Sequence, residues 1–474
     1  MPLINGSTVP VDDTADFVVV GSGAGGGTVA RWLAEAGHDV IIVEEGAPPR
    51  AAANTADAVA TLYRDGGAQA AFGMDVLPLL QGCAVGGTTV INGAIQVPFP
   101  EAVYREWVAA DPAWGSLLPW RQLEQARERV DAALNIHATP RDLWGGNGSA
   151  MRRALGSEAH PTRRNVRGCK GSARCMIGCP NGAKQSTDVA MIPAAMSHGA
   201  RVYAQCAVQK ITVIGRRARG VSARFSSGAT GTFHARRAVI LAAGAVHSPW
   251  LLLRSGVRVG AGFTCHPGAA MAGLFPDAIH NRPEASQSME SLAYLAEGIK
   301  FESLLMPSAL QKARVPGVGE QLTRRVAQLD RVALWGVAAR AQARGRVMRG
   351  PFGPMVLYTP TVADRRILLK GLARLAVAMF DAGAVEVWPS VHGAPDVIRS
   401  REQAMRIADL PPGAGAIPMV ATHLFGGVPV RERFQVPGVD GLVLADASLF
   451  PTNLGVNPMS AITAVATVVA EAWA

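Results

Sequence analysis

The chain has 474 residues, too long for one ordinary hydrophobic core, so two or three interlocked domains are expected. Hydrophobic residues make up 49% of it and charged residues only 17%, a composition that excludes a disordered protein. The net charge of +10 favours contacts with acidic protein surfaces or anionic lipid headgroups, whereas the scattered basic residues, without a basic run interleaved with aromatics, argue against nucleic-acid binding.

The first segment, residues 1–16, contains neither an apolar core nor a positively charged lead-in, so no secretory signal is predicted there. No uninterrupted apolar stretch of the sequence is long enough to cross a bilayer. The six cysteines do not have the pattern of a secreted disulfide framework. We therefore expect a cytoplasmic protein without a transmembrane segment, in which any membrane contact is peripheral.

A parallel βαβ unit is predicted next. Residues 17–20 form an apolar run without polar alternation, as expected of a strand that is buried on both faces. A glycine-rich loop follows, and then residues 28–36 form a predicted helix that ends at Gly37. Residues 40–43 are the second buried strand, and the crossover between the two strands should be right-handed.

The loop between strand and helix has the pattern of a dinucleotide-binding turn. In such a turn Gly21 allows the sharp bend, Gly23 lets the backbone approach a pyrophosphate, and Gly26 lets the helix pack closely on the strand. The helix N-terminus then offers free N–H groups and a positive dipole end to the phosphates. Glu44 follows the second strand, 23 positions after Gly21, where a carboxylate can accept both ribose hydroxyls. The residues assigned to this site are Gly21, Gly23, Ala24, Gly26, Glu44 and Glu45.

Beyond this unit the composition and the predicted secondary structure of the chain change several times. We predict a helical insert over about 101–157, a cysteine-rich loop over 165–187, and short strands with glycine turns up to residue 270. Residues 271–420 are rich in aromatics, methionines and arginines and lack phosphate-binding glycines. Residues 421–474 again resemble the first domain in their sequence pattern. The predicted fold class is mixed α/β (α+β). A discontinuous Rossmann-like domain (14–270, completed by 421–474) is interleaved with a smaller substrate domain (271–420) of antiparallel sheet and helices.

Three long segments resemble signatures of the glucose–methanol–choline (GMC) oxidoreductase family. They are residues 82–93 (GCAVGGTTVING), residues 244–256 (GAVHSPWLLLRSG) and residues 444–459 (LADASLFPTNLGVNPM). The βαβ unit alone leaves NAD and FAD open, although its acid argues against NADP, whose 2′-phosphate it would repel. The resemblance implies FAD, so the Rossmann-like domain is expected to be an FAD-binding domain.

The resemblance also assigns parts of FAD to individual residues. It implies Asn92 along the isoalloxazine, Asp446 at the ribityl–pyrophosphate, and the backbone N–H of Met459 at the pyrimidine end. Some relatives attach the flavin through a histidine just before the position of Asn92. Ile91 stands there in this chain, which predicts non-covalent FAD. The other implied cofactor contacts are Gly86, Gly87, Thr88, Gly93, Ala94, the backbone at Val208, Ala243, Ala447 and Pro458.

Two further matches imply active-site residues. Residues 422–427 (THLFGG) are similar to the family's HxxGG segment, which carries its first active-site histidine, here His423. Asn457 takes the second position, and the His/Asn combination is similar to long-chain alcohol oxidases and cholesterol oxidase. Removing hydride from an alcohol carbon needs a base for the hydroxyl proton and a group that places the oxygen, roles that we assign to His423 and Asn457. The histidines interpreted as structural are His247, His266 and His392.

Three cysteines, Cys169, Cys175 and Cys179, crowd into one loop and are followed by a proline. Clustered thiolates before a proline recur in iron–sulfur sites. The segment also resembles the loop that binds a [3Fe–4S] cluster in flavin-dependent glucose and fructose dehydrogenases of the same family. A similar cysteine-rich stretch in long-chain alcohol oxidases, which runs into a segment like residues 182–186 (GAKQS), is interpreted as a plain folded loop. Zinc is a poor fit because structural zinc needs four ligands. The cluster and the plain loop both stay open.

The leading prediction is an FAD-dependent oxidoreductase that oxidises the CH–OH group of an alcohol to an aldehyde or ketone by hydride transfer to flavin N5. One alternative is a flavin and iron–sulfur dehydrogenase subunit for a sugar-type substrate that passes electrons to a cytochrome or another redox partner. Another is a lyase on the same fold. Residues 291–295 and 301–306 are predicted apolar helices that suit a lipophilic alcohol, although aromatic side chains also stack on sugars. The electron acceptor, whether oxygen, quinone or redox protein, stays open.

Overall fold

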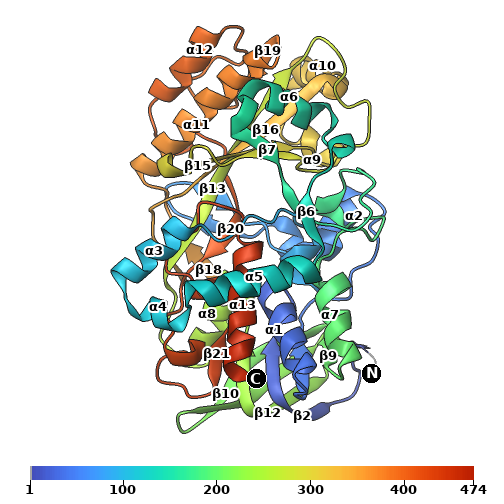
Figure 1. The fold of residues 1–474 in the computed structure, drawn as a ribbon, viewed down its shortest axis with the longest axis vertical. Coiled ribbons are helices and arrows are strands. Elements are labelled where there is room, and N and C mark those ends of the chain that lie inside the picture. The colour runs from blue at the N-terminus through green and yellow to red at the C-terminus, as the bar shows by residue number, and fades with distance from the viewer. Residues whose placement is uncertain (1–2) are drawn as a thin grey trace.

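The computed structural model describes residues 3–474, which form two large sheets, a lower one at the bottom of Figure 1 and an upper one that extends from the top of the picture to its middle. In the lower sheet the strands follow the order β1-β9-β3-β2-β12-β11-β10, and β21 pairs with β12. Their bounds are β1 (Leu3–Asn5), β2 (Val11–Val20), β3 (Val40–Val43), β9 (Arg201–Ala204), β10 (Cys206–Ile214), β11 (Arg217–Phe225), β12 (Thr230–Leu241) and β21 (Leu442–Leu444).

The predicted βαβ unit is the centre of this lower sheet. The predicted strand 40–43 is β3, and the predicted strand 17–20 is the end of β2, with which β3 pairs in parallel. The helix between them, α1 (Ala24–Glu35), begins four residues earlier than predicted. The reason is tertiary packing, because the three glycines at 25–27 are poor helix formers but are all buried against neighbouring segments.

The upper sheet follows the order β5-β4-β18-β17-β13-β16-β15-β14-β7, and β19 and β20 also pair with β13. Its strands are β4 (Ala70–Phe72), β5 (Val76–Pro78), β7 (Ala159–Pro161), β13 (Ala261–Leu274), β14 (Met289–Ser291), β15 (Ile299–Leu304), β16 (Val332–Ala339), β17 (Gly345–Arg349), β18 (Pro354–Leu357), β19 (Glu386–Trp388) and β20 (Val420–Phe425). A small separate sheet pairs β6 (Ile136–Ala138) with β8 (Arg163–Asn165).

The long strand β13 is the centre of the upper sheet, where β16, β17, β19 and β20 all pair with it. It contains the predicted domain boundary at residue 270, and its pairing with β16 and β20 is antiparallel, as predicted for the substrate sheet. Strands β4, β5 and β7, from the predicted first domain, also enter the upper sheet, and so does β20 from the C-terminal segment. The prediction of apolar helices at 291–295 and 301–306 is wrong, because residue 291 ends β14 and most of the second segment is β15.

Helices cover both sheets. On the lower sheet α1 packs against α13 and α7, and α13 against α5, which together form the front layer in Figure 1. The bounds are α2 (Thr55–Leu62), α3 (Glu101–Ala110), α4 (Ala113–Leu117), α5 (Trp120–Ala133), α6 (Gly145–Leu155), α7 (Thr187–Ser197), α8 (Gly244–Arg254), α9 (Ser308–Lys312), α10 (Gly319–Ala327), α11 (Val362–Asp381), α12 (Arg401–Met405) and α13 (Met459–Trp473).

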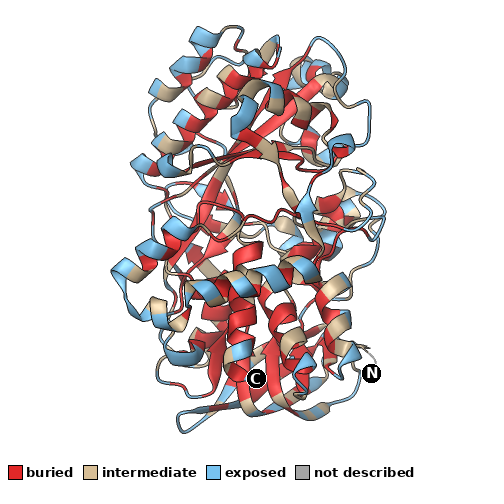
Figure 2. Cartoon of the chain, in the orientation of Figure 1, coloured by how far each residue is buried: buried red, intermediate tan, exposed pale blue. Residues whose placement is uncertain are grey.

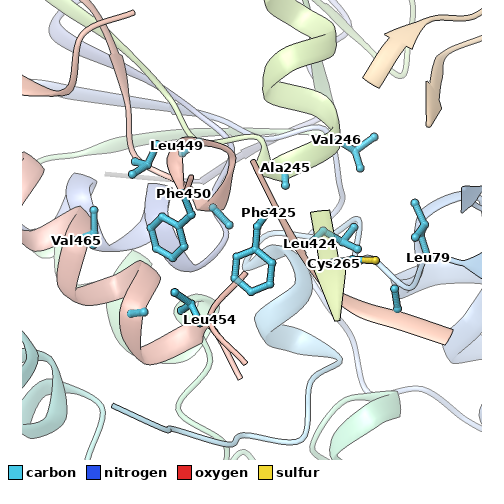
Figure 3. Packing of buried hydrophobic residues seen from close by; sticks show 14 of the residues in the cluster. Leu79, Ala245, Val246, Cys265, Leu424, Phe425, Leu449, Phe450, Leu454 and Val465 are labelled. Carbon is cyan, nitrogen blue, oxygen red and sulfur yellow. The ribbon is translucent and has the colours of Figure 1, made fainter. Parts of the chain in front are cut away.

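One contiguous hydrophobic core runs through both halves, and Figure 2 shows its buried residues filling the strands and the inward faces of the helices. Around the junction of β13, β20 and the C-terminal segment, Phe425 stacks on Phe450 with ring centroids 6.1 Å apart, surrounded by aliphatic side chains such as Leu424 and Leu454 (Figure 3). This packing fixes β20, which carries the predicted catalytic histidine, against the segment that leads to Asn457.

Candidate active site

A cavity of about 450 Å³ is lined by residues of both sheets and runs from the loop after β2 to β15, β16 and β20. It collects most residues that the sequence predicts for cofactor and substrate. Those that line it are Gly21, Gly23, Ala24, Glu44, Glu45, Gly87, Thr88, Asn92, Gly93, Val208, Ala243, His423, Asp446, Ala447, Asn457, Pro458 and Met459. Gly26, Gly86 and Ala94 are not part of the lining. The segments that line this cavity are far apart in sequence, and the fold brings them together around one space, as expected if they bind the same cofactor.

The glycine loop leaves room on its cavity side. A Cβ on Gly23 would meet no protein atom closer than 4.0 Å, so the missing side chain leaves space for a ligand and does not serve protein packing. The first turn of α1 has no acidic residue and no side-chain cap, and its free N–H groups begin beside the cavity. A loop and helix end of this kind suit the pyrophosphate of a dinucleotide, so the residues present fit FAD.

Other glycines of this unit serve close packing. A Cβ on Gly26 would lie 1.9 Å from the carbonyl oxygen of Gly21, which is how the helix approaches the strand so closely. A Cβ on Gly25 would lie 1.7 Å from the carbonyl oxygen of Ala445, in the C-terminal segment. Gly25 therefore couples the N-terminal unit to the segment that carries the predicted ribityl contacts.

Replacing Gly25 with alanine should abolish FAD retention, because α1 must move away from the C-terminal segment to admit the methyl group; overpacking of this kind costs about 1–3 kcal/mol or more. The ratio of flavin absorbance to protein absorbance after gel filtration measures the effect. The matched control is Gly413→Ala, where a Cβ meets no atom within 4 Å. Full flavin content in Gly25→Ala would show that the two segments do not need this close approach.

Glu44 holds the glycine loop as well as lining the cavity. Its Oε2 accepts hydrogen bonds from the backbone N–H (2.9 Å) and the hydroxyl (2.7 Å) of Ser22, and its Oε1 accepts one from the N–H of Gly46 (2.8 Å). Burial raises the pKa of Glu44, and these donors oppose that shift. The neighbouring Glu45 instead forms an ion pair with Arg64 at 2.7 Å. Of the two acids, Glu44 thus has the fixed position expected of a ribose ligand.

Asp446 joins two of the three family-like segments. Its carboxylate accepts hydrogen bonds from the N–H of Gly244 (2.8 Å) and the hydroxyl of Ser248 (2.5 Å), and from the N–H (2.8 Å) and hydroxyl (2.5 Å) of Ser448. Burial raises its pKa in spite of these donors. The side chain is therefore committed to positioning the start of α8, and it lines the cavity beside Ala447.

His423 and Asn457 meet on the cavity wall, with His423 Nε2 and Asn457 Nδ2 3.4 Å apart. His423 comes from β20 and Asn457 from the turn before α13, so the fold unites the two predicted catalytic residues. Burial lowers the pKa of His423 to about 4, which leaves the ring neutral near pH 7. On the other side of the ring, Nδ1 of His423 lies 3.1 Å from Nδ1 of His266.

The neighbours of these two histidines determine where their protons sit. The N–H of Gly455 donates to Nε2 of His266 at 2.7 Å, so neutral His266 carries its proton on Nδ1 and can donate it to His423. His423 then carries its own proton on Nε2, beside the amide nitrogen of Asn457. In this resting arrangement two N–H donors face the same region of the cavity, where an oxygen atom of a substrate could accept from both.

A buried charge network that the sequence reasoning missed supports Asn457. The ammonium group of Lys300 contacts Glu290 at 2.8 Å and also contacts Glu302 and the Oδ1 atom of Asn457. Burial alone would lower the pKa of Lys300, but the two carboxylates hold it above its usual value, so the amine is charged. Lys300 therefore fixes the Asn457 amide with its oxygen away from His423 and its nitrogen toward it.

Of the two features that sequence reasoning missed, the Lys300 network and His266, only the first had a weak signal in the sequence. Lys300 and Glu302 interrupt an apolar run at positions two apart, which in a strand places them on one face and indicates a buried pair. His266, interpreted as structural from its turn-like neighbours, instead contacts His423 and lines the cavity. Its role follows from the pairing of β13 with β20, which no local pattern reveals.

The three cysteines line a second, much smaller cavity, but their surroundings are cationic. Arg164 donates to the sulfur of Cys175 at 3.1 Å and to that of Cys169 at 3.7 Å. Burial alone would raise the pKa of Cys175, yet Arg164 and Lys184 together lower it. Residues 3–474 contain no group of three or more His, Cys, Asp or Glu side chains placed to hold a metal. The structure thus gives the iron–sulfur cluster no support, and it stays a prediction from sequence alone.

The cysteine-rich loop also supports the predicted flavin segment. The ammonium group of Lys184 donates to the carbonyl oxygens of Val90 (2.6 Å), Asn92 (3.0 Å) and Cys175 (2.8 Å). The side chain of Asn92 in turn donates to the sulfur of Met459 at 3.2 Å.

Among the described residues, no helix is both long enough and apolar enough to span a bilayer.

The chain is similar to a family of known proteins. Family models described as GMC oxidoreductase match residues 59–268 and 343–466. An uncharacterised GMC-type oxidoreductase of Mycobacterium tuberculosis is 35% identical, over 96% of this chain and 75% of the relative, and one of Sinorhizobium fredii is 32% identical, over 97% and 94%. A long-chain-alcohol oxidase of Arabidopsis thaliana is 26% identical, over 95% of this chain and 65% of the relative.

Solved structures show the same fold. Pyridoxine 4-oxidase from Mesorbium loti matches with a TM-score of 0.70 at 16% identity, over 96% of this chain and 98% of that chain. A variant of formate oxidase from Aspergillus oryzae, whose structure concerns FAD modification, matches with a TM-score of 0.72 at 16% identity, over 98% of both chains. With the family models and the bacterial relatives, these likenesses establish that the chain belongs to the glucose–methanol–choline (GMC) oxidoreductase family of FAD-dependent enzymes.

Proposed function

We propose that the protein oxidises the CH–OH group of an alcohol to an aldehyde or ketone. The observation that carries this proposal is the meeting of His423 and Asn457, two polar groups 3.4 Å apart, in the cavity that also reaches the glycine loop. When bound, FAD supplies the oxidant that accepts hydride from the substrate carbon. Ile91 lines the cavity where some relatives have an attaching histidine, and its aliphatic side chain supports non-covalent FAD.

In this proposal the protein's own residues handle the substrate oxygen and its proton. Asn457, held by Lys300, donates its amide N–H to the oxygen, and neutral His423 accepts the hydroxyl proton at Nε2. The acceptor role needs a bare Nε2, whereas the resting hydrogen bonds place a proton there. His423 must therefore move its own proton to Nδ1, and His266 must stop donating to it. His266 is thus a positioning residue in the proposed reaction.

The wall around these two residues supports a lipophilic alcohol as substrate. Leu304 on β15, Met306 just after it and Ala270 on β13 line the same cavity as His423. A sugar would need several polar partners at this wall, and Glu302 there is engaged with Lys300 and Gln287. The likeness to long-chain-alcohol oxidases of Arabidopsis thaliana points the same way.

Anaerobic mixing of the flavin-loaded protein with a panel of alcohols tests the proposal. We expect aliphatic alcohols of increasing chain length to bleach the flavin absorbance with increasing efficiency, and glucose or fructose to leave it unchanged. Preferential bleaching by the sugars would favour the sugar dehydrogenase alternative. Bleaching by dithionite but by no alcohol or sugar would exclude a CH–OH oxidoreductase. Subsequent mixing with oxygen, a quinone or a cytochrome identifies the acceptor from the rate of flavin reoxidation.

The low pKa of His423 predicts an unusual pH profile. A base must be unprotonated, and the His423 ring is neutral above its pKa of about 4 and protonated below it. The rate constant for flavin reduction at low substrate concentration should therefore stay level as pH falls through 6.5 and decline only near pH 4. Anaerobic stopped-flow measurements, with far-UV circular dichroism to confirm folding at each pH, provide the profile. A decline centred near 6.5 would show that an ordinary exposed histidine, and not buried His423, is the base.

A further inference from the structure

The outer face of β4, β5, β17 and β18, at one end of the upper sheet, is apolar, although a sheet face turned to solvent is normally polar. In the register of these strands Leu357 pairs with Phe72, and Phe72 pairs with Val76. Paired residues point to the same side of a sheet, and these three side chains are 40%, 51% and 67% exposed. The alternate residues point inward and are buried: Ala71, Leu77, Val347 and Val356.

The apolar character extends beyond this row. A second row pairs Met348 with Met355, both partly exposed, and the hairpin tips add Met74 and Phe352. Met74 is 73% exposed and the Phe352 ring is fully exposed, so each projects beyond its strands. We call this surface, the outward side chains of the four strands and their two tips, the outer sheet face. Large apolar side chains gathered in this way mark a binding surface.

Positive charge accompanies the outer sheet face. Arg346 pairs with Leu357 in the register and so lies in the same row, whereas Arg349, the last residue of β17, alternates to the opposite side together with Val347. Arg346 is exposed and forms no ion pair in the part of the chain that the structure describes. Residues 340–363 contain no acid, and the one acid of residues 68–80, Asp75, is buried against Arg365. The face therefore offers cationic and apolar groups together, with no exposed carboxylate among them.

We propose that the outer sheet face docks the protein on an anionic phospholipid membrane. The exposed aromatic and aliphatic side chains would enter the headgroup region, and Arg346 would meet lipid phosphates. A second copy of the chain fits less well, because it would bring the same arginine without a carboxylate to neutralise it. The proposal is independent of the alcohol substrate, since these residues do not line the cavity.

Cosedimentation of the flavin-loaded protein with vesicles tests the proposal. We expect binding to vesicles of equimolar phosphatidylcholine and phosphatidylglycerol, weaker binding to phosphatidylcholine alone, and release at high salt. The variant Arg346→Gln should lower the partition coefficient about fivefold. The double variant Phe72→Ser with Phe352→Ser should lower it at least about tenfold. Unchanged flavin content shows that each variant is folded.

A matched control exists on the hairpin of β10 and β11 at the bottom of Figure 1, where Ile214 is 66% exposed and Arg216 and Arg219 are exposed. Ile214→Ser combined with Arg216→Gln and Arg219→Gln removes the same kinds of group and should leave vesicle binding intact. Equal loss in the control, or equal binding to both kinds of vesicle, would overturn the proposal. So would sedimentation velocity showing a dimer that the Phe72 and Phe352 substitutions dissociate, because a second copy would then cover the face.

Discussion

Replacing His423 with alanine should slow the reduction of bound flavin by an alcohol by about 10²–10⁴-fold, the usual contribution of a positioned general base. FAD should stay bound, because the glycine loop and the Asp446 junction lie elsewhere on the cavity wall and keep their hydrogen bonds. Anaerobic stopped-flow spectroscopy of the flavin absorbance gives the rate, and the absorbance spectrum of the purified variant gives the cofactor content.

A second substitution at the same position separates the two roles that the geometry allows. Glutamine in place of His423 can donate an N–H to the substrate oxygen but cannot take its proton, so His423→Gln should be as slow as His423→Ala if the residue is the base. A near-normal rate in His423→Gln would instead assign the residue to hydrogen-bond donation, as the resting proton positions permit. The exposed His392, substituted by alanine, is the control and should leave the rate unchanged.

The parts of this protein that could be predicted from sequence are those in which the residues of one short segment are sufficient to indicate its structure. The run at 40–43 is buried on both faces and has the length of its strand, and the glycines at 21, 23 and 26 each serve a local geometry. The helix predicted over residues 28–36 begins later than α1 because glycine has a low helix propensity, which excluded residues 25–27 from the prediction. In the structure the cost is offset by contacts with segments more than 150 residues away, such as Thr187 against Gly27.

What could not be predicted depends on contacts between distant segments. Residues 301–306 have an apolar composition that suits a helix or a strand equally well, and only pairing with β16 decides for a strand. The same pairing turns Lys300 and Glu302 toward Glu290 and Asn457, so the charge network cannot be recognised before the sheet is known. The site prediction therefore found the two residues within motifs and missed the residues that orient them.

That network carries the largest stability effect that we expect from a single substitution. Lys300 is 1% exposed, and replacing it with methionine leaves the carboxylates of buried Glu290 and partly buried Glu302 without a counter-charge. Removing one partner of a buried ionic cluster costs about 3–5 kcal/mol of the free energy of unfolding. The Asn457 amide also loses the contact that fixes its orientation. Urea denaturation followed by circular dichroism, on protein with FAD bound, measures the loss.

Two comparisons show whether burial of the charges causes the loss of stability in Lys300→Met. The Arg324–Glu320 pair is 3.7 Å apart with both side chains more than 70% exposed, and Arg324→Met should cost no more than about 1 kcal/mol. Combining Lys300→Met with Glu290→Gln and Glu302→Gln removes the stranded charges and should restore much of the stability. The triple variant should still reduce flavin slowly, because the Asn457 amide is no longer held. If Lys300→Met and Arg324→Met cost the same, the buried network contributes no more than a surface pair, and Asn457 must be oriented by its other neighbours.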